Sequence, residues 1–221
     1  MKRNPILLFC IAYIVLLLFV FGLLCSYPKL ELHLLLNSYH TGILDTFFKY
    51  YSTLAEWPLY ILALLPILWK KKEITIFFAL CELSAGAIIQ VLKYLIKTER
   101  PVSAFENCHD MVLPLVPGVD LHHGNSFPSG HASTFFVFST CCALILAYHY
   151  QKSKRHNYGT DLMISLAMLA LLLMAALGAY SRVYLSQHFL SDVCVGSIIG
   201  FVTTCLFFYF AGNKILKLKN E

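Results

Sequence analysis

Long apolar stretches separated by short polar segments run along the whole chain. Almost no charged residue interrupts six of them, which cover residues 6–26, 53–69, 74–92, 132–150, 162–180 and 193–211. Most approach the roughly 20 residues that a helix needs to cross a bilayer. The pattern predicts an all-α fold, a bundle of six transmembrane helices. The stretch at 53–69 is the weakest of the six, because it is short and contains Pro58 and Pro66.

The composition agrees with a membrane protein. Of 221 residues, 58% are hydrophobic and only 13% are charged, with a mean hydropathy of +0.68, so the chain cannot cover a water-soluble domain with polar side chains. No repeat and no long hydrophilic stretch is visible, and residues 1–221 are predicted to form a single membrane domain. The eight cysteines lie mostly within or beside apolar stretches, which favours packing over disulfide formation.

Basic residues gather in the loops of one side. If six helices alternate in direction, eleven of the seventeen lysines and arginines fall on the side that holds both termini: Lys2, Arg3, Lys70, Lys71, Lys72, Lys152, Lys154, Arg155, Lys214, Lys217 and Lys219. The positive-inside rule places that side in the cytoplasm. Topology therefore explains the net charge of +5. Because the basic residues are spread over several loops, no nucleic-acid partner is predicted. The pattern makes no prediction of oligomeric state.

The opposite, outer side carries the two longer loops, at about 27–52 and 97–127. The first of these is rich in apolar and aromatic residues and predicts an interfacial amphipathic helix. Three polar clusters also stand at helix ends, and the alternation from the third helix to the sixth puts all three on this side. They include cations, for which the positive-inside rule gives no reason.

The first cluster, residues 93–101, closes the third helix with Lys93, Arg100 and Pro101. If the helix persists, the two cations lie about two turns apart on one face, while Pro101 favours an extended conformation at Arg100. Both cations can then reach one point. Snorkelling of basic side chains at a helix end explains this cluster equally well when it is considered alone.

The second cluster, residues 125–131, begins the fourth helix with Pro128, Ser129, Gly130 and His131. Proline suits the first helical turn, and the free amides of Ser129 and Gly130 are expected to point outward at the positive end of the helix dipole. These amides predict an anion site. Taken alone, however, a helix cap beside a polar histidine is the better explanation.

The third cluster, residues 181–192, contains Arg182, His188 and Asp192. At a spacing of four on a helix, Asp192 can accept one ring N–H of His188, which fixes the tautomer and leaves the other nitrogen free to attack. A His–Asp pair that only ties helices together is the alternative, but ionisable groups within a membrane are usually functional.

Together the clusters supply what phosphoryl transfer requires. This chemistry needs charge stabilisation over three equatorial oxygens, an in-line nucleophile and an acid for the leaving group. The spacing Lys-x6-Arg-Pro, then Pro-Ser-Gly-His, then Ser-Arg-x5-His-x3-Asp resembles the signature of the type 2 phosphatidic acid phosphatase superfamily. The match is complete at Lys93, Arg100, Pro101, Pro128, Ser129, Gly130, His131, Ser181, Arg182, His188 and Asp192.

The resemblance implies a role for each of these positions. His188 attacks phosphorus to form a phosphohistidine, Asp192 is its partner, and His131 protonates the leaving group and then activates water. The phosphate is implied to be held by Lys93, Arg100, Ser129, Gly130 and Arg182.

No cofactor and no metal is implied, and the sequence shows no cluster of three or more carboxylates of the kind that Mg²⁺ requires. An alternative metal site is His109, His122 and His123 with Asp110 and Asp120, although loop histidines beside a headgroup site are more often solvated. Glu82 lies roughly 17 Å along the third helix from the first cluster, so we expect it to make a structural hydrogen bond.

The expected function is hydrolysis of a phosphate monoester or pyrophosphate on a membrane lipid, at the periplasmic face of a bacterial inner membrane. Candidate substrates are a lipid A phosphate, a polyprenyl pyrophosphate, phosphatidylglycerol phosphate and phosphatidic acid; the outer loop at 113–126 looks like that of small enzymes that include lipid A phosphatases. Soluble vanadium haloperoxidases share the phosphate-like site, but membrane helices favour the hydrolase. A lipid phosphotransferase is a second enzymatic alternative. A non-catalytic lipid-binding or transport protein is a further alternative, although it would be expected to have lost His131, His188 or Asp192.

Overall fold

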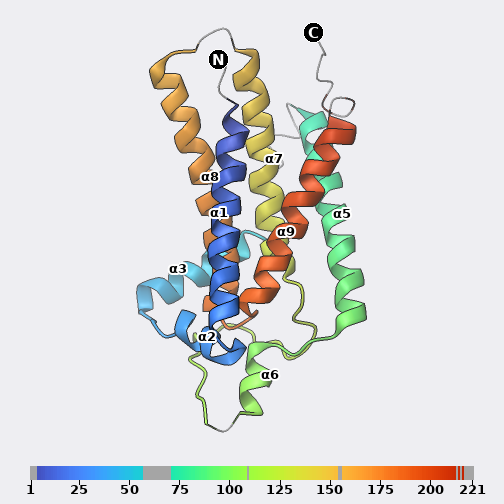
Figure 1. The fold of residues 1–221 in the computed structure, drawn as a ribbon. Helices are drawn as coiled ribbons and strands as arrows, with labels where there is room; N and C mark the ends of the chain where they lie inside the picture. Colours follow the sequence, from blue (N-terminus) through green and yellow to red (C-terminus); the bar gives the residue numbers. More distant parts are fainter. Residues whose placement is uncertain are drawn as a thin grey trace.

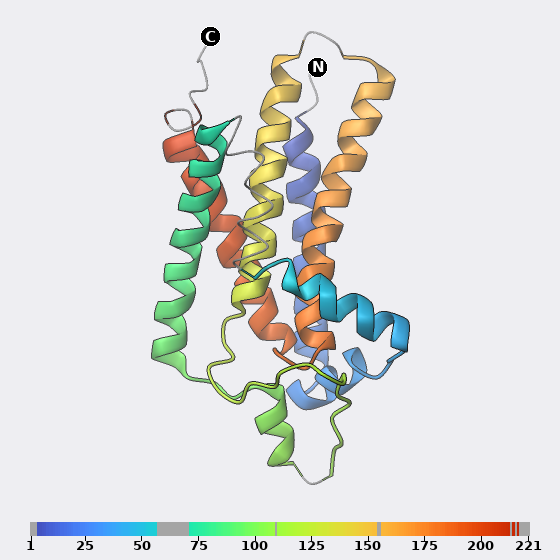
Figure 2. The same cartoon turned by 180° about the vertical axis from the view of Figure 1, so that it is seen from behind.

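A computed structural model of the chain describes residues 4–56, 71–108, 110–153, 156–212, 214 and 216. The regular elements in these residues are all helical (Figures 1 and 2): α1 (Pro5–Ser26), α2 (Lys29–Leu36), α3 (Gly42–Thr53), α5 (Lys72–Ile96), α6 (Pro101–Glu106), α7 (Gly130–Lys152), α8 (Tyr158–Tyr184), α9 (Leu190–Phe207) and a π-helical turn, η1 (Phe208–Gly212). The predicted all-α fold is confirmed.

Within the described residues, five helical segments are long and apolar enough to cross a membrane: Pro5–Ser26, Lys72–Glu106, Gly130–Lys152, Tyr158–Tyr184 and Leu190–Gly212. They correspond to five of the six predicted spans. The other predicted span, at 53–69, lies almost entirely outside the described residues.

The long helices run in alternating directions along one bundle (Figure 1). α1, α5 and α8 run downward in this view, whereas α7 and α9 run upward. The end of α5, the start of α7, the end of α8 and the start of α9 therefore meet at the lower end, where α2 and α6 also lie. All three polar clusters belong to these helix ends.

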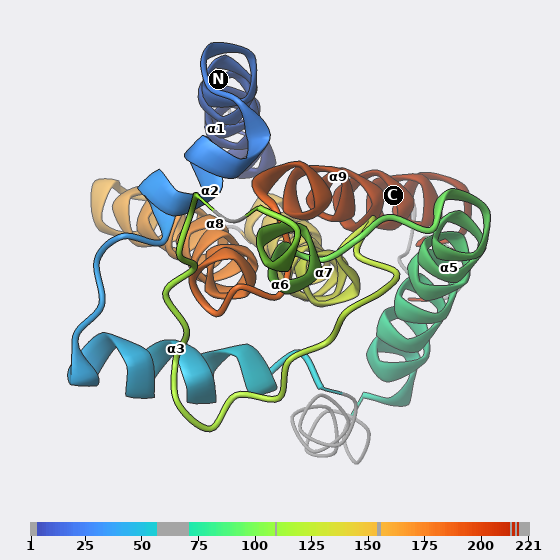
Figure 3. The ribbon, with the colours of Figure 1, turned by 90° about the horizontal axis from the view of Figure 1, so that it is seen from below.

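The helix α7 is the most buried of the candidate spans and packs against α5, α8 and α9 (Figure 3). The largest apolar cluster joins it to α1 and α8 through Phe9, Phe136 and Met168. Tyr13 of α1 reaches α9, where its hydroxyl forms a hydrogen bond of 2.9 Å with that of Ser197. Four helices thus share one core around α7.

Two glycines bring the backbone of α9 directly against α7. A Cβ added at Gly196 would lie 2.3 Å from the carbonyl oxygen of Ser129, and one added at Gly200 would lie 2.4 Å from that of Ser133. The Gly-x3-Gly spacing is typical of close helix contacts in membranes. Because Ser129 is the N-cap of α7, this contact fixes the first turn of α7 beside the first turns of α9.

The third span ends differently from the prediction. The helix α5 stops at Ile96, and Lys97 adopts a left-handed conformation with φ of 46°. Arg100 is extended before α6 begins at Pro101. The extended conformation predicted at Arg100 is confirmed, whereas the helix itself does not persist, so Lys93 and Arg100 do not share a helix face.

The loop after α1 forms two short helices, α2 and α3, in place of the single interfacial helix that its composition predicts. The helix α3 lies across the side of the bundle near its lower end (Figures 1 and 2). One face of this helix is packed, with Phe48 and Ser52 buried, and the other is exposed, with Ile43 and Tyr50. The buried Phe48 packs on Tyr184, which fixes α3 to α8.

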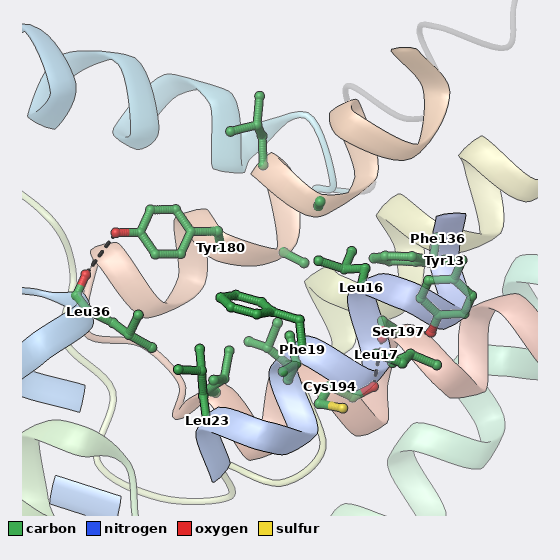
Figure 4. A pocket seen from close by; sticks show the side chains of 16 residues that line it. Tyr13, Leu16, Leu17, Phe19, Leu23, Leu36, Phe136, Tyr180, Cys194 and Ser197 are labelled. Atoms are coloured by element: carbon green, nitrogen blue, oxygen red, sulfur yellow. Dashed lines mark hydrogen bonds between the residues drawn. The ribbon is translucent and has the colours of Figure 1, made fainter. Parts of the chain in front are cut away.

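An apolar cavity of about 260 Å³ lies between α1, α8 and α9 (Figure 4). Phe19 lies at its wall, and so do Tyr13 and Ser197, which are joined by their hydrogen bond. At another edge the Tyr180 hydroxyl donates to the Leu36 carbonyl at 2.7 Å. The described residues that line this cavity include no charged side chain, so the candidate chemistry lies elsewhere.

The contact between α7 and α9 can be tested by adding a methyl group to it. Gly196→Ala and Gly200→Ala should each destabilise the protein by about 1–3 kcal/mol, because the new Cβ meets a rigid backbone carbonyl. Thermal unfolding in detergent measures this effect. Gly86→Ala in α5 is the matched control, since a Cβ there meets nothing within 4 Å. Unchanged stability of both α9 variants would contradict the close contact.

Candidate active site

The end of α5 is tied to the segment that precedes α7. Nζ of Lys93 donates to the carbonyl of Asn125 at 2.6 Å, and Nε of Arg100 donates to that of Gly124 at 2.9 Å. Both cations therefore reach the same short segment although the helix breaks between them. Each keeps further donors, because an ammonium group has three N–H bonds and a guanidinium group five.

Arg100 also reaches the loop between α8 and α9. Its Nη1 donates to the backbone and side-chain oxygens of Gln187, at 3.0 and 3.3 Å. The amides of Gln187 and His188 both donate to the carbonyl of Arg182, at 2.9 and 3.1 Å, which folds the loop back over the end of α8. The structure thus places His188 beside both arginines.

Arg182 lies deep in the protein, with only 8% of its surface exposed. Among the described residues, its Nε has no hydrogen-bond partner. A buried cation without a full set of partners is costly, and an anion bound beside it would lower that cost. The unpaired donor therefore favours an anion-binding role for Arg182.

His188 is 2% exposed and immediately precedes the first turn of α9. Burial lowers the pKa of His188 far below its ordinary value; the carboxylate of Asp192 opposes this shift, whereas the positive charges of Arg100 and Arg182 add to it. The imidazole is therefore neutral at physiological pH. A neutral imidazole has a free ring nitrogen, as a nucleophile must.

The hydrogen bond predicted between His188 and Asp192 is not formed directly. Nδ1 of His188 lies 3.7 Å from Oδ2 of Asp192, which is beyond hydrogen-bonding distance. The hydroxyl of Ser126 contacts both groups, at 3.3 Å from Nδ1 and 2.5 Å from Oδ2. The reason is that α9 begins at Leu190, so His188 lies before the helix and the assumed helical spacing does not apply.

Ser129 caps α7 and contacts α9. Its Oγ accepts a hydrogen bond from the amide of Ala132 at 3.4 Å, and its own amide donates to the carbonyl of Asp192 at 2.9 Å. The expectation that this amide is free for an anion is therefore wrong. Gly130 is the first residue of α7, where amides have no acceptor within the helix. The next residue, His131, is partly buried.

Glu82 lies within α5, away from the three clusters. The hydroxyl of Thr134, on α7, donates to its carboxylate at 2.5 Å. The structural hydrogen bond predicted for Glu82 is thereby confirmed, and it links α5 to the central helix.

The loop between α6 and α7 contains the residues of the alternative metal site that the sequence suggested. His109 lies outside the described residues, and elsewhere the described chain contains no group of three His, Cys, Asp or Glu residues that could hold a metal. The pKa of His122 is lowered, first by partial burial and second by the positive charges of Arg100 and Arg182. His122 therefore lies within electrostatic reach of both arginines. His123 is 3.3 Å from the hydroxyl of Ser103.

A chain of hydrogen bonds that the sequence did not reveal supports the loop between α8 and α9. Asn37 donates to the hydroxyl of Ser186 and accepts from His40 at 2.6 Å. His40 pairs with Asp45 at 2.9 Å, and Asp45 accepts from the hydroxyl of Tyr184 at 2.6 Å. These residues come from separate parts of the chain and match no motif, so only the fold brings them together.

The fold and the clustered cations define a helical membrane protein with a group of positively charged side chains at one end of its bundle. The sequence profile of the PAP2 superfamily matches residues 74–216, which is more than half of the chain. The chain therefore belongs to the PAP2 superfamily. Family and fold together make it an integral membrane phosphatase.

Two solved structures have a similar fold. One is LpxE of Aquifex aeolicus, with a TM-score of 0.64 and 24% identity over 84% of this chain and 98% of that one. The other is the first transmembrane PAP2 type phosphatidylglycerolphosphate phosphatase from Bacillus subtilis, with a TM-score of 0.63 and 19% identity over 99% of both chains. A search of curated proteins found no match to this chain.

Proposed function

We propose that the protein hydrolyses a phosphate monoester or pyrophosphate on a membrane lipid through a phosphohistidine intermediate. The observation that carries this proposal is the buried imidazole of His188 beside Arg100 and Arg182. An uncharged nucleophile next to cations that bind its electrophile suits a two-step phosphoryl transfer. The position of the site, at the end of apolar helices, supports a lipid substrate, because headgroups lie at that level.

The phosphate oxygens are held by fixed positive groups in this proposal. Arg182 offers its unpaired Nε, and Lys93 and Arg100 offer donors beyond those used for backbone carbonyls. Gly130 adds its amide at the positive end of the α7 dipole. Ser129 contributes its hydroxyl and not its amide, because the amide is bonded to α9.

The reaction proceeds in two displacements. Nε2 of His188 attacks phosphorus while its Nδ1 stays on the side of Asp192, and the bond from phosphorus to the lipid oxygen breaks. The bound phosphate places negative charge beside His131, which favours the protonated form of this imidazole, and that form gives its proton to the departing oxygen. His131 then takes a proton from water, which attacks the phosphohistidine and releases inorganic phosphate and free His188. Each step leaves charge on oxygens that the cations stabilise.

We place the site on the periplasmic face of a bacterial inner membrane. The first turn of α5 and the end of α7, which carry Lys72 and Lys152, lie at the end of the bundle opposite the site (Figure 1). The positive-inside rule assigns that end to the cytoplasm. The substrate classes proposed for such a site are a lipid A phosphate, a polyprenyl pyrophosphate and phosphatidylglycerol phosphate.

Purified protein in mixed micelles is expected to release inorganic phosphate from at least one of these three classes of lipid, and to do so in the presence of EDTA. Fixed cations, and not a carboxylate-bound metal, do the electrostatic work in the proposed mechanism. Vanadate should inhibit by occupying the phosphate site. Activity that stops with EDTA and returns with Mg²⁺ would contradict this mechanism, and transfer to an added alcohol without phosphate release would favour a phosphotransferase.

Variants of the two histidines should differ in kind. His188→Ala is expected to abolish turnover and the labelled phosphoenzyme, trapped in alkaline denaturant because phosphohistidine is acid-labile. His131→Ala should reduce the rate with a lipid alkoxide leaving group by about 10²- to 10⁴-fold, the range for general acid–base catalysis. p-Nitrophenyl phosphate needs little protonation and should recover much of that loss.

His149→Ala is the control for these variants, since His149 lies at the other end of the same helix as His131. It should leave both rates near those of the unmodified protein. Near-normal phosphate release by His188→Ala would contradict the mechanism, and so would labelled phosphate found on His131.

The proposed orientation predicts which loops are accessible from outside. In a cysteine-free background, a single cysteine at Asn107 should react with an impermeant thiol reagent added to intact spheroplasts, because α6 lies at the end of the bundle that holds the site. A cysteine at Ser153, after α7, should react only after lysis. The opposite labelling pattern would overturn the periplasmic assignment.

A further inference from the structure

Ser126 is fully buried and lies between the two groups that the mechanism pairs. Its Oγ is 2.5 Å from Oδ2 of Asp192 and 3.3 Å from Nδ1 of His188, whereas these two atoms are 3.7 Å apart. The hydroxyl of Ser126 therefore bridges the carboxylate and the ring, which also lie close to each other. Ser126 is not one of the residues of the three motifs, yet it occupies the position between these two groups.

The chemistry of the three groups fixes the direction of the hydrogen bonds. An ionised carboxylate can only accept, so the Ser126 hydroxyl donates to Asp192. Its oxygen then has lone pairs left to accept the Nδ1–H of His188. This arrangement selects the tautomer that carries its proton on Nδ1 and leaves Nε2 unprotonated.

Backbone groups hold both Ser126 and its partner Asp192 in place. Its amide donates to the carbonyl of Thr98 at 3.0 Å, and the amide of Phe127 donates to the Thr98 hydroxyl at 2.9 Å. Oδ2 of Asp192, on the other side, also accepts from the amide of Phe189 at 3.0 Å. The serine is thus anchored to the segment after α5, and the carboxylate to the start of α9.

We propose that Ser126 is a positioning residue that relays the Asp192 carboxylate to His188. It holds the imidazole in the reactive tautomer and stabilises the positive charge that the ring acquires when Nε2 bonds to phosphorus. This inference rests on the proposed function, because it assigns a role within the same reaction.

A matched pair of variants isolates the hydroxyl. Threonine and valine have nearly the same shape, so Ser126→Thr and Ser126→Val add similar bulk to a buried site and differ mainly in one hydroxyl group. Ser126→Val should lower kcat by about 10- to 100-fold, the range seen when outer-shell partners of a functional histidine are removed. Ser126→Thr should keep at least about a tenfold advantage over it. KM should change little in both, because the Ser126 hydroxyl is already bonded to Asp192 and His188.

A double-mutant cycle shows whether Ser126 acts through Asp192. If it does, Ser126→Val should cost little more than about threefold in an Asp192→Asn background, since coupled residues are not additive. Ser139→Ala is the structural control: this serine is also fully buried on α7 and has no hydrogen-bond partner among the described residues. It should leave kcat unchanged.

The outcomes separate this inference from the function on which it rests. If His188→Ala is inactive while the threonine and valine variants have equal activity, the relay is wrong and the phosphohistidine mechanism stands. Fully additive losses in the double mutant would also overturn the relay. If His188→Ala stays active, the proposed function itself is wrong.

Discussion

At Gly196 and Gly200 the backbone of α9 lies directly against the carbonyl groups of Ser129 and Ser133 on α7. Lipid chains are as apolar as the helix surfaces, so close packing of this kind supplies much of the attraction between membrane helices. Because one of these contacts involves the N-cap of α7, the same packing lets the Ser129 amide hold the carbonyl of Asp192. Helix packing thus positions the backbone of Asp192, and the loop residue Ser126 and the amide of Phe189 hold its carboxylate.

This packing creates a site in which positive charge is held before any ligand arrives. Lys93 and Arg100 are bonded to backbone carbonyls, and Arg182 is buried with an unpaired donor. Such cations destabilise an empty site, but they need little rearrangement when an anion binds, which is the condition for strong electrostatic stabilisation of a transition state. Burial favours the neutral form of His188, and the positive charges of Arg100 and Arg182 act in the same direction.

The sequence predicted the parts of this arrangement that depend on period and order. The alternation of apolar spans was enough to place the three clusters at one end of the bundle, whatever the second span does. It was not enough for local geometry. The break at Lys97, the engaged amide of Ser129 and the start of α9 at Leu190 depend on how neighbouring helices pack, and a spacing rule assumes a helix that continues. Ser126 carried no signal, because a serine two residues before a proline is ordinary in a loop.

The loop between α8 and α9 shows why these local details matter for the chemistry. It is held by Arg100 from the α5 side, by the carbonyl of Arg182 at the end of α8, and by Asn37 through the hydroxyl of Ser186. A short loop with contacts on several sides has few alternative conformations, so the ring of His188 is ordered before substrate binds. Within the mechanism proposed above, this order reduces the entropic part of the barrier, because the nucleophile already faces the place where the cations hold phosphorus.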